Sequence, residues 1–185
     1  MRKNIKYAMI LLTICAVSAF ALALTNSITS PVIAQMDSNN RVKALDAVSA
    51  GYDIGEQQEV TGHAYVTYVI DLQKDTEVAG YILGLKTAGY GGEMTLVASY
   101  TTQGEMLFAQ LLTHNETPGL GKKAEDDGYM DKFKGTGGAK PVPTNKTMLS
   151  SGDAQAVSGS SVTFTAIAKA INGGSEYVKS LGGVK

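Results

Sequence analysis

An uncharged apolar run from Ala8 to Leu24 constrains this chain more than any other stretch. At a rise of about 1.5 Å per residue, a helix over this run is roughly 26 Å long, near the lower limit for crossing a bilayer. Three basic residues lie among the first six positions, whereas Arg41 is the first basic residue after the run. Because the basic flank of a membrane helix stays in the cytoplasm, the pattern predicts a single-pass anchor over residues 1–25 in the cell membrane. The N-terminus is then cytoplasmic and the rest of the chain extracytoplasmic.

A cleaved signal peptide is the alternative, because Ala21-Leu22-Ala23 resembles a small-residue cleavage site. We expect the anchor to stay uncleaved. Cys15 is the only cysteine and lies inside the apolar run, so it can form neither an internal disulfide nor, alone, an iron–sulfur ligand set. Two histidines are too few for a metal site without carboxylate help, and we expect none. Outside the basic flank, 13 basic residues face 17 acidic ones, a balance that offers no basic face to nucleic acid.

The region after the anchor is predicted to form an α+β domain over residues 61–185. Four runs rich in β-branched, aromatic and apolar residues follow one another with short turns between them. These runs are residues 64–70, 78–85, 94–100 and 106–112. Consecutive strands with short turns predict an antiparallel sheet, and helical segments on either side predict the α+β class.

Helices are expected both before and after the strands in the chain. Residues 26–60 read as a polar link and then a broken amphipathic helix, which begins at Ser30-Pro31 and ends near Gly51. A short helix is expected over residues 120–134. A longer one follows Ser158, which has the chemistry of an N-cap, because apolar residues then recur at three- and four-residue steps as far as Ile171. The first turn of such a helix is a natural seat for a phosphate.

Two short stretches carry a resemblance to a known family. The first is Glu116-Thr117-Pro118-Gly119-Leu120-Gly121, preceded by His114, and the second is Ser158-Gly159-Ser160-Ser161. With these stretches the chain resembles the FMN-binding domain of the G subunit of the Rnf electron-transport complex, and of the related C subunit of the Na+-translocating NADH:quinone reductase. In that family a Thr-Pro-Gly-Leu-Gly segment lines the isoalloxazine ring. A Ser/Thr-Gly-Ala-Thr motif carries FMN through a phosphoester on its last threonine.

The resemblance implies a covalent FMN on Ser161, which stands where the family has its modified threonine. The other cofactor-binding residues that it implies are Ser158, Gly159, Ser160, Thr163, Glu116, Thr117, Pro118, Gly119, Leu120 and Gly121. Gly119 and Gly121 are expected to let the backbone approach a flat ring, and His114 to be a structural group near it. The chain departs from the family motif at Ser160 and Ser161, and also at Gln155, where the family usually has Asp.

The implied function is electron transfer. No trio of nucleophile, base and orienting group is visible, so no catalytic residue is expected, and a flavin would supply the redox chemistry. The resemblance implies a membrane-anchored subunit that relays electrons through FMN within an ion-translocating ferredoxin:NAD+ oxidoreductase. Its partners are other membrane and peripheral subunits, and a flavin transferase for maturation. Two alternatives stay open: a free-standing extracellular electron-transfer flavoprotein, and a non-redox anchored adaptor that has lost the cofactor.

Overall fold

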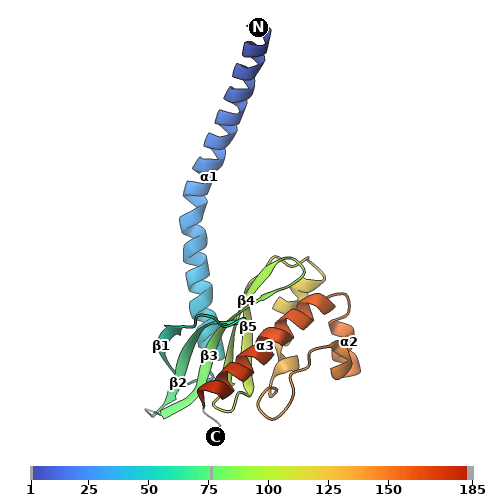
Figure 1. Ribbon diagram of the computed structural model, residues 1–185. Helices are drawn as coiled ribbons and strands as arrows, with labels where there is room; N and C mark the ends of the chain where they lie inside the picture. The colour runs from blue at the N-terminus through green and yellow to red at the C-terminus, as the bar shows by residue number, and fades with distance from the viewer. Residues whose placement is uncertain (1, 76, 183–185) are drawn as a thin grey trace. The chain divides into compact units, whose positions relative to one another are not determined.

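The computed structural model describes residues 2–75 and 77–182, with side chains from Asn4 onward. The chain divides into two units, Met1–Arg41 and Val42–Lys185. The first unit is helical and belongs to α1 (Arg2–Val48), drawn in blue in Figure 1. This helix is long and apolar enough to cross a membrane, and its large apolar side chains from Ile5 to Val42 are exposed.

Helix α1 runs without a break through the stretch expected to be a polar link. Pro31 lies inside it, so the predicted helix start at Ser30-Pro31 is wrong. A proline in a helix interior loses one backbone hydrogen bond, at a cost of about 3 kcal/mol, which does not by itself end a long helix. The polar residues before it also fit a helix, because the Ser27 hydroxyl donates to Leu24 O (2.8 Å) and the Thr29 hydroxyl to Thr25 O (3.0 Å).

The second unit contains a five-stranded antiparallel sheet in the order β1-β2-β3-β4-β5, which confirms the predicted α+β class. Its strands are β1 (Asp53–Glu59), β2 (Val66–Lys74), β3 (Glu77–Ala88), β4 (Glu93–Thr101) and β5 (Met106–Thr113). Four of the strands match the predicted runs, but β1 lies within residues 26–60, where no strand was expected. Its polar sequence has no strand signature of its own, and pairing with β2 holds it at the edge of the sheet, with a register shift between Ile54 and Gln57.

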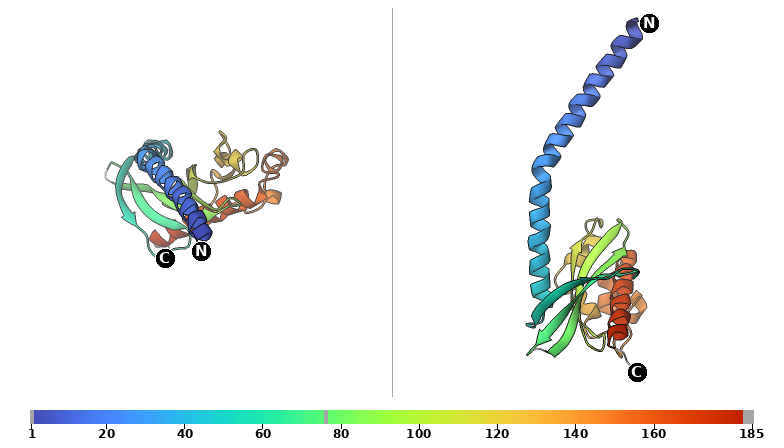
Figure 2. Two further views of the ribbon diagram at one scale, coloured as in Figure 1. Left: turned by 90° about the horizontal axis from the view of Figure 1, so that it is seen from above. Right: turned by 60° about the vertical axis from the view of Figure 1, so that its left-hand side comes forward.

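Both faces of the sheet are covered. Leu83 and Leu96 lie in the core beneath α3 (Ser161–Leu181), which crosses one face (Figure 2). Their chain neighbours Ile82 and Val97 point the other way and pack with Val48, at the end of α1. Because successive strand residues face opposite sides, two covered faces leave β4 buried along most of its length.

The segments between β5 and α3 are short and differ from the prediction. Residues 120–134 form two 3-10 helices in place of one helix, because the backbone turns extended at Asp126 (φ −66°, ψ 143°). These are η1 (Gly121–Glu125) and η2 (Met130–Phe133), followed by η3 (Lys146–Met148) and α2 (Ser151–Ala156). Helix α3 begins at Ser161 with Ser160 as its N-cap residue, so the expected N-cap at Ser158 is wrong.

Candidate functional site

A cavity of about 440 Å³ lies where the β3–β4 loop, the segment after β5 and the start of α3 meet. We call it the Glu116 cavity. Eight of the eleven predicted site residues line it: Glu116, Thr117, Leu120, Gly121, Gly159, Ser160, Ser161 and Thr163. Tyr90 and Val162 line it too and were not foreseen. The structure therefore brings together two motifs that lie some forty residues apart in the chain.

Three predicted residues, Pro118, Gly119 and Ser158, are exposed and are not part of the lining. Gly119 has a φ of 77°, and a Cβ placed there would meet nothing within 4 Å. Its conformation, and not a close approach, is what favours glycine. The close approach occurs at Gly121, where a Cβ would lie 2.1 Å from Glu116 Oε2.

Glu116 is the most enclosed ionisable side chain of the cavity wall, with 6% of its surface exposed. Its Oε1 accepts a hydrogen bond from the Gly91 N–H (3.0 Å), and its Oε2 accepts one from the Thr163 hydroxyl (2.6 Å). The carboxylate therefore joins the β3–β4 loop, its own segment and α3. Satisfying both oxygens is what makes its burial tolerable.

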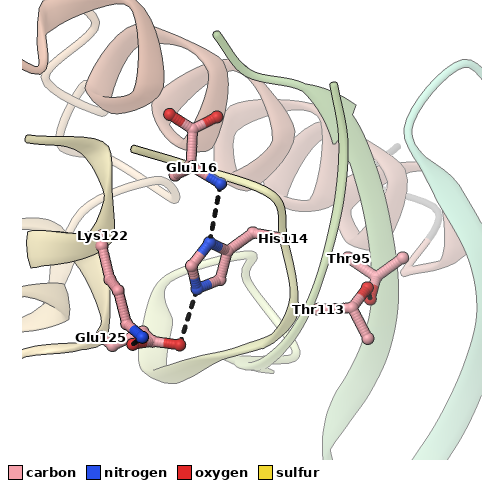
Figure 3. A network of polar contacts seen from close by, with 6 residues as sticks. All are labelled: Thr95, Thr113, His114, Glu116, Lys122 and Glu125. Atoms are coloured by element: carbon pink, nitrogen blue, oxygen red, sulfur yellow. Dashed lines mark hydrogen bonds and ion pairs between the residues drawn. The ribbon is translucent and has the colours of Figure 1, made fainter. Parts of the chain in front are cut away.

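His114 holds the backbone of Glu116 in place (Figure 3). Its Nδ1 accepts a hydrogen bond from the Glu116 N–H (3.1 Å), and its Nε2 lies 2.6 Å from Glu125 Oε1. With Nδ1 as the acceptor, Nε2 carries the ring hydrogen and donates it to Glu125. This hydrogen bond lowers the pKa of Glu125, with further help from the charge of Lys122. The arrangement agrees with a structural role for His114.

A pair of threonines stands directly before this network. Thr95 of β4 and Thr113 of β5 are register partners, and their hydroxyls lie 2.6 Å apart (Figure 3). This cross-strand hydrogen bond ties the last residue of β5 to the sheet. His114 and Glu116 therefore leave the sheet from a defined point.

The hydroxyls at the start of α3 differ in exposure. Ser160 is 4% exposed and donates to Val157 O (3.1 Å), and Thr163 is 1% exposed and bonded to Glu116. Ser161, at the first position of the helix, is exposed. Of these three cavity-lining hydroxyls, only that of Ser161 is open to solvent.

Tyr129 is buried behind Ser160. Burial, partly opposed by the Ser160 hydroxyl and with a smaller contribution from the negative charge of Glu116, raises the pKa of its phenol to about 12. The Tyr129 hydroxyl has no partner of good hydrogen-bond geometry among the described residues. It is an unsatisfied polar atom directly behind the cavity wall.

A second, more open cavity of about 710 Å³ lies on the other side of Ser161. We call it the Lys169 groove. Its lining residues are Ala64, Tyr65, Lys86, Thr87, Ala88, Glu93, Ser161, Val162, Thr165, Ala166 and Lys169. Ser161, Thr165 and Lys169 recur at four-residue steps along one face of α3. Ser161 and Val162 belong to both cavities, so a group attached to Ser161 has space on either side.

Comparison with known proteins agrees with this geometry. The FMN-binding domain family matches residues 89–175, a range that contains every residue lining the Glu116 cavity. The G subunit of the Na(+)-translocating ferredoxin:NAD(+) oxidoreductase complex of Acetobacterium woodii is 30% identical, over 90% of this chain and 87% of the relative. The G subunit of the proton-translocating ferredoxin:NAD(+) oxidoreductase complex of Clostridium ljungdahlii is 29% identical, over 92% and 89%. The chain therefore belongs to the family of G subunits of ion-translocating oxidoreductase complexes, and it carries their FMN-binding domain.

Proposed function

We propose that this chain is a membrane-anchored flavoprotein subunit that relays electrons through FMN within an ion-translocating ferredoxin:NAD+ oxidoreductase. The observation that carries the proposal is the Glu116 cavity, which lies wholly inside the matched FMN-binding domain. The two relatives named above are subunits of ferredoxin:NAD(+) oxidoreductase complexes, and this supports placing the chain in such a complex. FMN supplies the electron-transfer chemistry when bound, and the protein positions it.

The residues of the cavity fit a flavin. Leu120 and Val162 offer apolar contact for a flat ring, and Glu116 and Thr117 are polar groups that can orient it. The first turn of α3 presents backbone N–H groups and the positive end of a helix dipole, which favour a phosphate. Lys86 and Lys169, in the adjoining groove, place positive charge on the same side of the domain.

The proposed attachment point is Ser161. It is exposed at the first turn of α3, whereas the hydroxyls of Ser160 and Thr163 are buried and engaged. A phosphoester forms when the Ser161 Oγ bonds to the phosphorus of a flavin dinucleotide, the hydroxyl proton leaves, and the pyrophosphate bond breaks to release a nucleoside monophosphate. Among the described residues, none forms a hydrogen bond with the Ser161 hydroxyl as a general base would, so we propose that a flavin transferase supplies the catalysis.

Three variants test the attachment when each is co-expressed with a flavin transferase. Ser161→Ala should lack the mass of FMN less one water and should show no flavin fluorescence on a denaturing gel. Ser161→Thr keeps the hydroxyl and should be loaded. Ser158→Ala, which removes an exposed hydroxyl outside the cavity, should load as the wild type does. Fluorescence retained in Ser161→Ala would move the attachment elsewhere.

The role within a complex has its own test. A flavoprotein that works inside a complex should co-purify from native membranes with integral redox subunits. Purification alone with a bound flavin would favour the free-standing alternative, and purification of a colourless chain would favour the adaptor.

We further propose that the domain lies outside the cytoplasm. The three basic residues before Ala8, against none between Leu24 and Arg41, support a cytoplasmic N-terminus. Protease added to intact cells stripped of their wall should then digest residues 42–185. Cleavage that requires lysis would place the domain in the cytoplasm.

A further inference from the structure

Two close glycines, in addition to two hydrogen bonds, restrict the position of the Glu116 carboxylate. A Cβ on Gly121 would lie 2.1 Å from Oε2, and a Cβ on Gly89 would lie 2.2 Å from Oε1. Bare backbone therefore closes on both oxygens, while Gly91 N–H and the Thr163 hydroxyl donate to them. The position of this side chain in the cavity wall is defined from four sides.

The negative charge of Glu116 has no counterion among the described residues. No lysine, arginine or histidine in this part of the chain forms an ion pair with it; Lys122 pairs with Glu125, and the His114 ring hydrogen is donated to Glu125 as well. Burying an unpaired carboxylate is costly, because its hydrogen bonds replace only part of the lost hydration. Its charge acts on its surroundings, since it adds to the raised pKa of Tyr129.

A role in joining three segments does not explain that charge. A glutamine at position 116 would accept from Gly91 N–H through its amide oxygen and donate to the Thr163 hydroxyl through its amide nitrogen. It would make the same links without burying a charge. The charge itself therefore calls for a function in the cavity.

We infer that Glu116 lowers the reduction potential of the flavin bound in the Glu116 cavity, an inference that rests on the proposed function. An electron entering a flavin adds negative charge, and a fixed, buried carboxylate on the wall of the cavity disfavours that addition. The two donors from Gly91 and Thr163 moderate the effect by drawing charge toward themselves. Glu116 thus acts through its field and position, with no bond to the cofactor required.

The main test is Glu116→Gln in full-length, flavin-loaded protein. It removes the charge and keeps the shape, so the midpoint potential should shift upward in a spectroelectrochemical titration. Glu125→Gln is the matched control: it removes one carboxylate charge from the same network, but from a side chain that is 46% exposed. Solvent screens that charge, so the control should shift the potential far less.

Two further variants separate charge from packing. Glu116→Asp keeps the charge and should stay near the wild-type potential. Thr163→Val removes the donor to Oε2 and should shift the potential downward, opposite to Glu116→Gln. This second variant decides the question if Glu116→Gln fails to hold flavin. An unchanged potential in flavin-loaded Glu116→Gln or Thr163→Val, or equal shifts in the Gln and Asp variants, would overturn the inference.

Flavin content of the wild type is measured first. A wild-type chain without flavin, after co-expression with a transferase, would overturn the proposed function together with this inference. A loaded wild type whose potential ignores the charge at position 116 would overturn the inference alone.

Discussion

The carboxylate of Glu116 and the hydroxyl of Thr163 meet at 2.6 Å, although 47 positions separate them in the chain. Both groups are buried, and they join the segment after β5 to the first turn of α3. The two sequence motifs of the candidate site are thus connected by a charge-assisted hydrogen bond, a class roughly twice as strong as neutral ones. Substitutions around this bond should therefore disturb both motifs at once.

Thr163→Val keeps the shape of the side chain and removes the donor to Glu116. A buried carboxylate oxygen then loses its partner, so unfolding free energy should fall by about 1–3 kcal/mol. Thr165→Val, further along α3 and only half-buried, is the control and should change stability by less. Urea denaturation monitored by circular dichroism measures both, and equal losses would show that the hydrogen bond to Glu116 contributes nothing.

Gly121→Ala should be more damaging than Gly119→Ala. The first substitution places a Cβ 2.1 Å from Glu116 Oε2 and 2.7 Å from the Thr163 hydroxyl oxygen, so the wall of the cavity has to shift. Such overpacking typically costs about 1–3 kcal/mol, and the flavin content should fall with it. The second substitution meets open space, and its cost is the left-handed backbone alone, about 1–2 kcal/mol, with flavin retained. Denaturation midpoints rank the stability of the two variants, and flavin absorbance ranks their flavin content. Loss of flavin in the Gly119 variant alone would contradict our assignment of the close approach to Gly121.

Tyr129→Phe should leave stability unchanged or raise it. The wild-type hydroxyl is buried without a partner of good geometry among the described residues, so removing it removes a desolvation penalty. Tyr100→Phe is the contrast, because the Tyr100 hydroxyl donates to Ile171 O (3.1 Å), and its loss should cost about 1 kcal/mol. Thermal unfolding of the two variants side by side tests the difference, and a destabilised Tyr129→Phe would reveal a hydrogen bond to Ser160 in solution.

Glu125 should make a small contribution to stability that is lost in acid. Its pKa is lowered in the folded state by the hydrogen bond from His114, so its contribution is present above the unfolded value of about 4.3 and is lost as the pH falls through the folded value. The side chain is 46% exposed, which limits the effect to about 1 kcal/mol or less. The wild type should therefore be slightly more stable than Glu125→Gln at neutral pH, and the two should converge in denaturation curves recorded as the pH falls below about 4. Parallel curves over the whole range would contradict the coupling to His114.

Much of the sheet could be read from the sequence, because β2 to β5 are dense in β-branched and apolar residues and are separated by short turns. Strand β1 could not, since its polar residues become a strand only through pairing with β2. The continuous α1 was missed because Pro31 is a strong local signal for a helix start, and the long apolar helix overrides it.

The candidate site was largely accessible because two short motifs contain most of its residues. The role of Gly91 was not, since a backbone N–H that donates to a distant carboxylate leaves no mark in residue type. Tyr90 sits in a glycine-rich loop that reads only as a turn. The Lys169 groove exists because α3 packs across the sheet and brings Lys169 to the side of Lys86. The positions of these two residues in the sequence do not predict that they lie together.

The exposure of Ser161 has a consequence for the order of events in the life of the protein. Its neighbours Ser160 and Thr163 become inaccessible once α3 has packed, whereas Ser161 stays at the surface of the finished fold. On the proposed chemistry, the folded domain can thus serve as the acceptor for the cofactor. Of the hydroxyls at positions 160, 161 and 163, the fold leaves only that of Ser161 open to a modifying enzyme, and the exposed Ser158 lies outside the cavity.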